Sequence, residues 1–225
     1  MISHFEPKSV TKALSDSYWK NAMKEEINQI GKNKTWELVP RPNDKNVIGG
    51  KWVFCNKLNE DDKVIRNKAR FVCKGYAQQE GINFGETLVP VARMESIRTF
   101  LAYASYKFFF FYQMDVKTTF VNGYSEEEVY MEQPKGFESS DKLDYLYQLK
   151  KALYVLKQAP RAWYSRLDKY FISNGFSRGK VDNTLYIKVI HDDILVVEIY
   201  VDDIIFGSTN DESTKHFSKN MEFEF

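Results

Sequence analysis

Cysteine and histidine are scarce in this chain of 225 residues. The only cysteines are Cys55 and Cys73, too few for a disulfide framework or a cysteine-rich zinc site. We expect two buried free thiols, although the pair could also be cross-strand neighbours in a hairpin. The three histidines, His4, His191 and His216, have no ligand-like spacing, so the sequence does not support zinc chemistry.

Long apolar runs are also absent. The longest, around residues 108–112 and 194–206, are too short or too interrupted by acids for a membrane helix, which takes about 20 residues. The first residues have neither the basic start nor the apolar centre of a secretion signal. With 43% hydrophobic residues, 11 glycines and 6 prolines, the chain has the composition of a globular protein with a substantial core. We therefore expect no membrane partner and an intracellular location.

Charge is nearly balanced overall, with a formal net charge of +1, but it is distributed unevenly. Residues 51–75 hold seven basic side chains against three acidic ones, and residues 150–170 hold six against one. Residues 122–145, between them, hold seven acids and two lysines. The two basic segments could line a groove for a polyanion if the fold brings them together, or they could be ordinary solvated faces.

Two acidic pairs flank a single apolar run, residues 194–200. Asp192 and Asp193 precede this run, and Asp202 and Asp203 follow it. Short β-branched runs separated by two polar residues are typical of tight hairpins, so each pair alone indicates a turn. A strand of seven residues spans about 23 Å, so at most one pair can belong to a given site. A functional role for either pair requires partners elsewhere in the chain.

Helical and strand patterns alternate along the chain, without an internal repeat. We expect helices over residues 17–30, 94–107, 159–176 and 210–223, with apolar faces at Trp19, Met23, Ile27 and Ile30 in the first and at Ile97, Leu101 and Ala104 in the second. We expect a basic hairpin over residues 50–78, a buried strand over 108–120 and a meander of strands over 183–190, 194–200 and 204–208. The pattern predicts an α+β fold whose antiparallel sheet carries helices on one face.

Asp115 lies where the apolar part of the segment 108–120 ends. Asp202 likewise follows an apolar strand. If the two strands lie side by side, Asp115 and Asp202 converge at one edge of the sheet. Close carboxylates in an apolar setting repel each other unless a divalent cation lies between them, and oxygen ligands suit Mg²⁺. Two such ions about 3.5 to 4 Å apart can support in-line phosphoryl transfer.

Five segments of the chain, in order and at matching spacings, resemble the reverse transcriptase of copia-type LTR retrotransposons. They are "WKNAMKEEINQIGKNKTWELVPRP", "VIGGKWVFCNKLNEDDKVIRNKARFVCKGYAQQEGINFGETLVPVARMESIRTFLAYAS", "YQMDVKTTFVNGYSEEEVYMEQPKGF", "LKKALYVLKQAPRAWY" and "IYVDDIIFGS". The resemblance implies the palm and fingers of a right-hand polymerase. It also implies RNA-directed DNA polymerisation, in which deoxynucleotides are added to a primer 3′-hydroxyl with two Mg²⁺, or with Mn²⁺ as a possible substitute.

The resemblance assigns the catalytic roles residue by residue. Asp115 and Asp202 match the aspartates that bind both metal ions, and Asp203 matches the second acid of the Tyr-x-Asp-Asp turn. The backbone carbonyl of Val116 is expected to face the triphosphate site and to serve as a further metal ligand. Tyr200 is expected to pack near the primer end.

The remaining matches concern the incoming nucleotide. Phe120 matches the aromatic residue that would clash with a ribose 2′-hydroxyl and so selects deoxynucleotides. Gln158 matches the glutamine that lies along the nucleotide. Arg70 matches the finger arginine that grips the phosphates, with Lys63 or Lys68 assisting, and a guanidinium suits phosphate oxygens.

The resemblance also implies a domain plan. Residues 1–17 form an N-terminal extension, the fingers comprise about 18–93 and 121–157, and the palm comprises about 94–120 and 158–225. The family continues beyond "NMEFEF" into the primer grip, thumb and RNase H region, so we expect a chain truncated before the thumb. The expected partners are an RNA or DNA template with its primer, deoxynucleotides, and the rest of the Pol polyprotein, including integrase. The expected location is cytoplasmic, in a virus-like particle.

Two substitutions depart from the family pattern, and two other functions remain open. Val155 stands where the family usually has glycine, which would strain a backbone with positive φ. Cys55 replaces a usual basic residue.

One alternative is a non-catalytic remnant that binds nucleic acid through the basic fingers. The other is a metal-dependent phosphohydrolase, which would leave Gln158 and Phe120 without a purpose.

Overall fold

The computed structural model describes residues 2–225 and divides them into two compact units. The first unit comprises residues up to 87 together with 124–162, and the second comprises 88–123 together with 163–225. The sequence placed the corresponding divisions at 93/94, 120/121 and 157/158, and the names fingers and palm stay predictions for these units. Within residues 2–225, no helix is both long and apolar enough to cross a membrane.

The first unit combines two helices, a four-stranded sheet and a separate hairpin. Its elements are α1 (Val10–Ser15), α2 (Ser17–Lys32), β1 (Trp36–Pro40), β2 (Val47–Ile48), β3 (Gly50–Leu58), β4 (Val64–Cys73), the 3₁₀ turn η1 (Gly75–Ala77), β6 (Tyr124–Met131) and β7 (Tyr145–Lys151). The sheet has the order β1-β7-β6-β2, and β3 pairs with β4 as the predicted basic hairpin. Helix α2 packs on β4.

Helix α2 forms where the sequence predicts it and runs two residues further, to Lys32. The Asp16 side chain caps its N-terminus by accepting from the backbone N–H groups of Tyr18 and Trp19. Trp19, Met23 and Ile30 are buried as expected, while Ile27 is half-buried. The segment before the helix contacts this unit, since the Trp19 indole donates to the Phe5 carbonyl at 2.7 Å.

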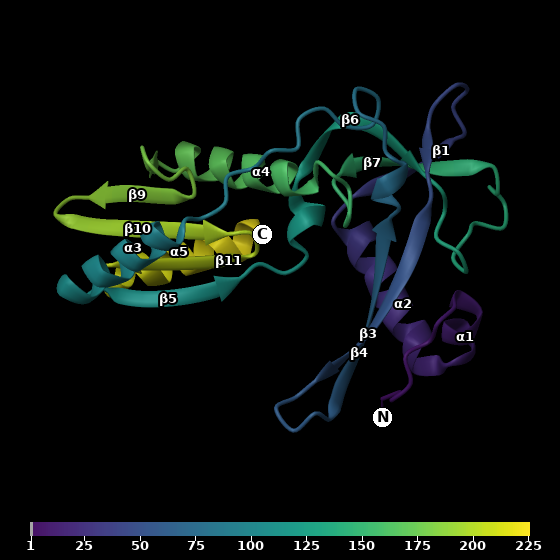
Figure 1. The fold of residues 1–225 in the computed structure, drawn as a ribbon, viewed down its shortest axis with the longest axis horizontal. Coiled ribbons are helices and arrows are strands. Elements are labelled where there is room, and N and C mark those ends of the chain that lie inside the picture. The colour runs from purple at the N-terminus through teal and green to yellow at the C-terminus, as the bar shows by residue number, and fades with distance from the viewer. Residues whose placement is uncertain (1) are drawn as a thin grey trace. The chain divides into compact units, whose positions relative to one another are not determined.

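The second unit is built around one antiparallel sheet. Its elements are α3 (Met94–Tyr106), β5 (Phe110–Asp115), the 3₁₀ turn η2 (Thr119–Asn122), most of α4 (Ala159–Ser173), β8 (Ser177–Arg178), β9 (Leu185–Ile190), β10 (Asp193–Tyr200), β11 (Asp203–Ser208) and α5 (Asp211–Glu224). The strand order is β5-β11-β10-β9-β8, and every pairing is antiparallel. Figure 1 shows β9, β10, β11 and β5 side by side in this order.

Helices cover both faces of this sheet, which corrects the prediction that they lie on one face. Val197 of β10 belongs to the apolar cluster that contains Leu167 of α4 and Phe217 of α5. Its neighbour Val196 belongs to a separate cluster with Phe100 and Ala104 of α3. Because successive residues of a strand point to opposite faces, α3 lies on one face while α4 and α5 lie on the other. The exposed side chain of Leu101 lies outside the α3 packing face, contrary to the prediction.

Strand β5 is an edge strand rather than the buried strand that its aromatic sequence predicted. Among residues 2–225 its only partner strand is β11, and Phe110 and Tyr112 remain 47% and 41% exposed. An edge strand has a neighbour on one side only, so its side chains keep more contact with solvent than those of a central strand. The apolar run of residues 108–112 indicated burial that this position in the sheet does not provide.

The two cysteines are neither both buried nor adjacent. Cys55 of β3 is exposed and pairs with Lys68 of β4, while Cys73 is buried and pairs with Gly50. Burial raises the pKa of the Cys73 thiol well above its ordinary value. The expectation of two buried thiols is therefore correct for Cys73 and wrong for Cys55.

Candidate active site

The predicted catalytic acids Asp115, Asp202 and Asp203 lie at one end of the β5–β11 strand pair in the second unit. Asp115, the last residue of β5, is the cross-strand partner of Asp203, the first residue of β11. The backbone N–H of Val116 continues the pairing by donating to the carbonyl of Asp202 at 2.9 Å. Directly opposed residues of an antiparallel pair point to the same face, so the Asp115 and Asp203 side chains are neighbours. The expectation that the two strands lie side by side is confirmed.

Asp202 lies in the two-residue turn that joins β10 to β11. Tyr200 pairs with Asp203, which leaves Val201 and Asp202 as the turn residues. Val201 has a φ of 57°, a left-handed conformation that a β-branched residue rarely adopts. The indole N–H of Trp163, a buried residue of α4, donates to the carbonyl of Val201 at 2.7 Å. The turn is thus held in an unfavourable backbone conformation by a contact from the helix.

The other acidic pair serves the structure at the opposite end of β10. Asp193 pairs with Ile190 across a tight turn, and its carboxylate accepts from the Thr209 hydroxyl at 2.6 Å and the Asn210 amide at 3.0 Å. These hydrogen bonds lower the pKa of Asp193. Asp193 therefore ties the start of β10 to the segment that leads into α5, and no acid faces it across the ladder.

The oxygen donors at the edge that carries Asp115 and Asp203 suit Mg²⁺ in kind. Asp115 and Asp202 are exposed, one Asp203 oxygen accepts from the Gln113 amide at 3.0 Å, and the Val116 carbonyl accepts from the Thr119 hydroxyl at 2.6 Å. A carbonyl oxygen has a second lone pair, so this contact still permits a metal. Within the part of the chain that is described, no group of three or more His, Cys, Asp or Glu side chains is arranged to hold a metal. The ligand types fit, but the three carboxylates do not converge as they stand.

Phe120, the predicted sugar-selecting residue, lies on the short 3₁₀ turn η2 that follows β5. Thr118 takes a left-handed φ of 56° before η2 begins. Phe120 is half-buried and packs against the cluster formed by α4, α5 and the sheet. The N–H of Gly123 donates to the Phe120 carbonyl at 3.1 Å, closing the turn. Tyr200, predicted near the primer end, is half-exposed at the end of β10.

A buried acid lies three residues before the turn of Val201 and Asp202 and was missed by sequence reasoning. Glu198 is 1% exposed and accepts from the Ser96 hydroxyl at 3.0 Å. The Thr184 hydroxyl lies 2.7 Å from its other oxygen and 2.6 Å from Asp182. Thr184 has one hydroxyl proton, so it can donate to only one of these two carboxylates at a time.

Burial and the charge of Asp182 raise the pKa of Glu198, although hydrogen bonds from Thr184 and Ser96 oppose the shift. Asp182 behaves in the opposite way. Burial disfavours its charged form, but hydrogen bonds from Thr184 and from the Arg93 backbone lower its pKa overall. A lone acid inside the apolar run "ILVVEIY" is the signal that could have identified this network.

The predicted phosphate-binding residues lie on the β3–β4 hairpin of the first unit. Lys68 and Arg70 are two residues apart on β4 and therefore share one face. Partial burial, followed by the nearby positive charge of Arg70, lowers the pKa of Lys68. The Arg70 guanidinium stacks on the Tyr154 ring at 5.1 Å. Lys63 precedes β4 and is about 23 Å of extended chain from Arg70, so Lys68 is the better candidate for a shared phosphate.

Gln158 is buried in the first unit, with both ends of its amide in use. It is 3% exposed, its oxygen accepts from the Gln78 amide at 2.9 Å, and its nitrogen donates to the Asn83 carbonyl at 2.9 Å. These bonds give Gln158 a structural role in joining two loops. Contact with a nucleotide stays a prediction for this residue.

Comparison with known proteins identifies the family of this chain. A family model described as reverse transcriptase (RNA-dependent DNA polymerase) matches residues 33–225. The chain is 40% identical over 218 residues to the retrovirus-related Pol polyprotein from transposon RE2 of Arabidopsis thaliana, covering 96% of this chain. It is 41% identical over 204 residues to the retrovirus-related Pol polyprotein from transposon TNT 1-94 of Nicotiana tabacum, covering 89% of this chain. The chain spans 15% of the length of each of these relatives.

Proposed function

Because the chain belongs to the reverse transcriptase (RNA-dependent DNA polymerase) family, we propose that it catalyses templated addition of deoxynucleotides to a primer 3′-hydroxyl. The observation that carries this proposal is the register of β5 and β11, which opposes Asp115 to Asp203 and leaves Asp202 in the adjoining turn. Two carboxylates side by side have little use in an ordinary strand pair, since like charges directly opposite destabilise a sheet.

Asp115 and Asp202 would hold divalent magnesium, with the Val116 carbonyl as a further oxygen ligand and Asp203 beside them. When bound, the metal would supply a Lewis acid that lowers the pKa of the attacking hydroxyl and stabilises the pyrophosphate that leaves. The protein's own part is to hold the acids at one edge. It does so through the β5–β11 ladder and through the contact from Trp163 to the turn.

The substrate contacts belong to the same proposal. Phe120 would exclude a ribose 2′-hydroxyl, and Tyr200 would pack near the primer end. Arg70 with Lys68 would bind the phosphates, and Gln158 would contact the nucleotide if its internal hydrogen bonds open. The partners would be a template with its primer, deoxynucleotides and other domains of a Pol polyprotein. This last partner follows from the Pol polyprotein relatives.

A second candidate function is nucleic-acid binding without polymerisation. Two observations favour it, namely that the three carboxylates do not converge and that Arg70 of β4 is exposed beside the half-buried Lys68. Its signature would be strong dependence of binding on salt, because each neutralised phosphate releases a counterion. A loss of affinity below about tenfold between 50 and 200 mM salt would argue against several phosphate contacts.

Single-nucleotide incorporation on an RNA template tests the polymerase function. The chain, a DNA primer annealed to RNA and Mg²⁺ should yield primers extended only by the deoxynucleotide complementary to the template base. Failure to extend, with salt-dependent binding intact, would support the non-catalytic alternative. Release of phosphate from nucleotides without any primer would instead support a phosphohydrolase.

A further inference from the structure

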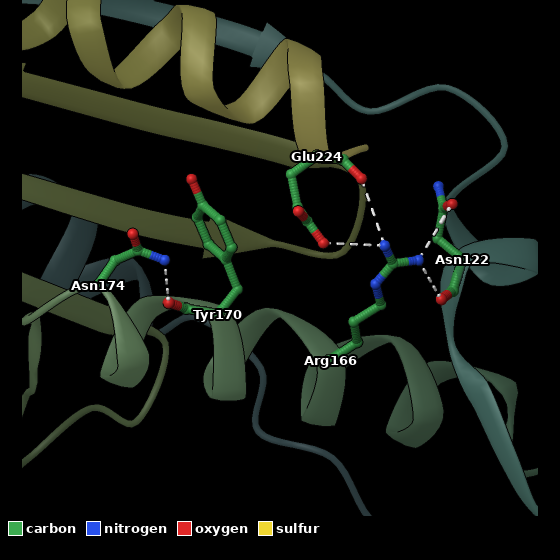
Figure 2. A network of polar contacts seen from close by, with 5 residues as sticks. All are labelled: Asn122, Arg166, Tyr170, Asn174 and Glu224. Carbon is green, nitrogen blue, oxygen red and sulfur yellow. Dashed lines mark hydrogen bonds and ion pairs between the residues drawn. The ribbon is translucent and has the colours of Figure 1, made fainter.

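Arg166 of α4 joins three segments of the second unit, as Figure 2 shows. One terminal nitrogen of its guanidinium donates to the Asn122 carbonyl at 2.7 Å and lies 3.4 Å from the Asn122 side-chain oxygen. The other donates to the Glu224 carboxylate at 3.1 Å and to the Glu224 carbonyl at 3.3 Å. The same guanidinium stacks on the Phe225 ring at 4.9 Å.

Asn122 depends on this contact for its position. The residue is buried, and its side-chain nitrogen has no hydrogen-bond partner among residues 2–225. Its carbonyl and side-chain oxygens both face Arg166. The Arg166 side chain is only 15% exposed, so little water is available to replace these bonds. Loss of the guanidinium would leave a buried carbonyl unsatisfied, which is costly.

The turn η2 couples the position of Asn122 to that of Phe120. The two residues belong to one 3₁₀ turn, and hydrogen bonds from Val121 to Thr118 and from Gly123 to Phe120 close it at 3.1 Å each. A shift of Asn122 therefore moves Phe120, whose ring is only half-buried against the core. Trp163 donates to Val201 in the turn of Val201 and Asp202, which we call the acid turn. Trp163 precedes Arg166 by three residues and so lies on the same side of α4.

We propose that Arg166 is a positioning residue for sugar selection, because it fixes Phe120 through Asn122. Trp163 fixes the acid turn in the same way, through Val201. One face of α4 thus positions Phe120 and the acid turn through separate contacts. The inference rests on the proposed polymerase function and adds a residue that neither touches substrate nor binds metal. A planar guanidinium donates to Asn122 and Glu224 from two separate nitrogens, and the single nitrogen of a lysine cannot reproduce this spacing.

The test compares incorporation of deoxynucleotides and ribonucleotides by the wild type, Arg166→Met, Arg166→Lys and Trp163→Phe. Arg166→Met should reduce the ratio of kcat/KM for deoxynucleotide over ribonucleotide by about tenfold to a hundredfold, the effect of a small displacement in a site. Arg166→Lys should restore part of that ratio, since one donor remains for the Asn122 carbonyl. Trp163→Phe should lower kcat for both nucleotides and leave the ratio unchanged.

Arg178→Met is the matched control. Arg178 of β8 pairs with Asp168 of α4, with a distance of 2.9 Å between Nε and the carboxylate. No contact of Arg178 with Asn122 or the acid turn is present within residues 2–225. This variant should leave the ratio as in the wild type. An Arg166→Met enzyme that loses both activities equally, or keeps the wild-type ratio, would overturn the inference.

A second measurement judges the inference if the wild type extends no primer, in which case the polymerase proposal itself has failed. Hydrogen exchange of residues 116–123 should be at least about tenfold faster in Arg166→Met than in wild type and Arg178→Met. Unchanged exchange in this segment would show that Arg166 does not fix the turn. The two failures are thus distinguishable, because the exchange experiment requires no activity.

Discussion

Asp115 and Asp203 face each other across the β5–β11 ladder, with a backbone hydrogen bond from Val116 to Asp202 beside them. No basic side chain makes an ion pair with either acid within residues 2–225. Like charges in this position lower the stability of a sheet. The arrangement is unfavourable for folding alone, and a bound cation would remove the penalty.

Asp115→Asn and Asp203→Asn should therefore stabilise the second unit while impairing catalysis. Each change removes one of two opposed charges, and the free energy of unfolding should rise by about 0.5 kcal/mol. Urea denaturation without divalent metal measures the gain. Asp192→Asn is the control, since Asp192 lies in the other turn with no acid opposite, and its unfolding should match the wild type. Destabilisation by Asp115→Asn would contradict the account of the pair.

Glu198→Gln should increase stability more at neutral pH than at acid pH. Burial raises the pKa of Glu198, so the folded state holds this proton more tightly than the unfolded chain does. The free energy of unfolding of the wild type consequently falls as the pH rises from 4.5, the ordinary value, through the raised pKa. The amide introduced by Glu198→Gln would not titrate, yet it could donate to Thr184 and accept from Ser96.

The measurement is the difference in unfolding free energy between Glu198→Gln and the wild type, followed across pH. We expect a small difference below pH 4.5 that grows as the pH rises and then levels. Glu198→Ala serves as the comparison, because it removes the acceptor of the partly buried Ser96 hydroxyl bond and should lose about 1 to 3 kcal/mol. A pH-independent difference for Glu198→Gln would contradict the raised pKa of Glu198.

Val155→Gly should stabilise the first unit. Val155 has a φ of 71° and a side chain that is 60% exposed, so the valine is strained and gains little from burial. Glycine adopts this conformation freely, and we expect the free energy of unfolding to rise by about 1 kcal/mol. Thermal unfolding measures the effect. Val53→Gly, in the regular strand β3, should lower stability instead, and a parallel response of both variants would refute the strain.

Arg70→Ala should weaken nucleotide binding, and Lys63→Ala should not. Lys68 is beside Arg70 on β4, whereas Lys63 lies about 23 Å away along the strand and cannot reach the same phosphates. We expect the KM for deoxynucleotides to rise by about tenfold for Arg70→Ala, the loss of one charge-assisted contact, with little change for Lys63→Ala. Steady-state incorporation measures both. Equal effects of the two variants would exclude a specific phosphate site at Arg70.

The sequence predicted those features that depend on local pattern. The hairpin tip at Asp202 follows from residue types at particular positions. The strain at Val155 followed instead from the resemblance, because the family usually has glycine at that position. The pairing of Asp115 with the acid turn also followed, because two similar apolar strands each ended in an acid.

Features that depend on position within the sheet could not be predicted in the same way. The aromatic residues of β5 indicate burial, but an edge position exposes them. Strand β10 has apolar residues on both faces, which is compatible with helices on both sides of the sheet. The packing of α3 against Val196 places a helix on the second face. Arg166 looked like one more charge in a basic segment, since nothing in its sequence neighbourhood indicates Asn122, which is 44 residues earlier.

The most direct test of the account compares Asp202→Asn with Asp192→Asn in Mg²⁺-dependent extension of a DNA primer on an RNA template. The two residues occupy turns at opposite ends of β10, and both are exposed. The account predicts that Asp202→Asn abolishes extension while Asp192→Asn extends the primer like the wild type. Equal activity of the two variants would contradict it, because the turn with Asp202 would then have no catalytic role.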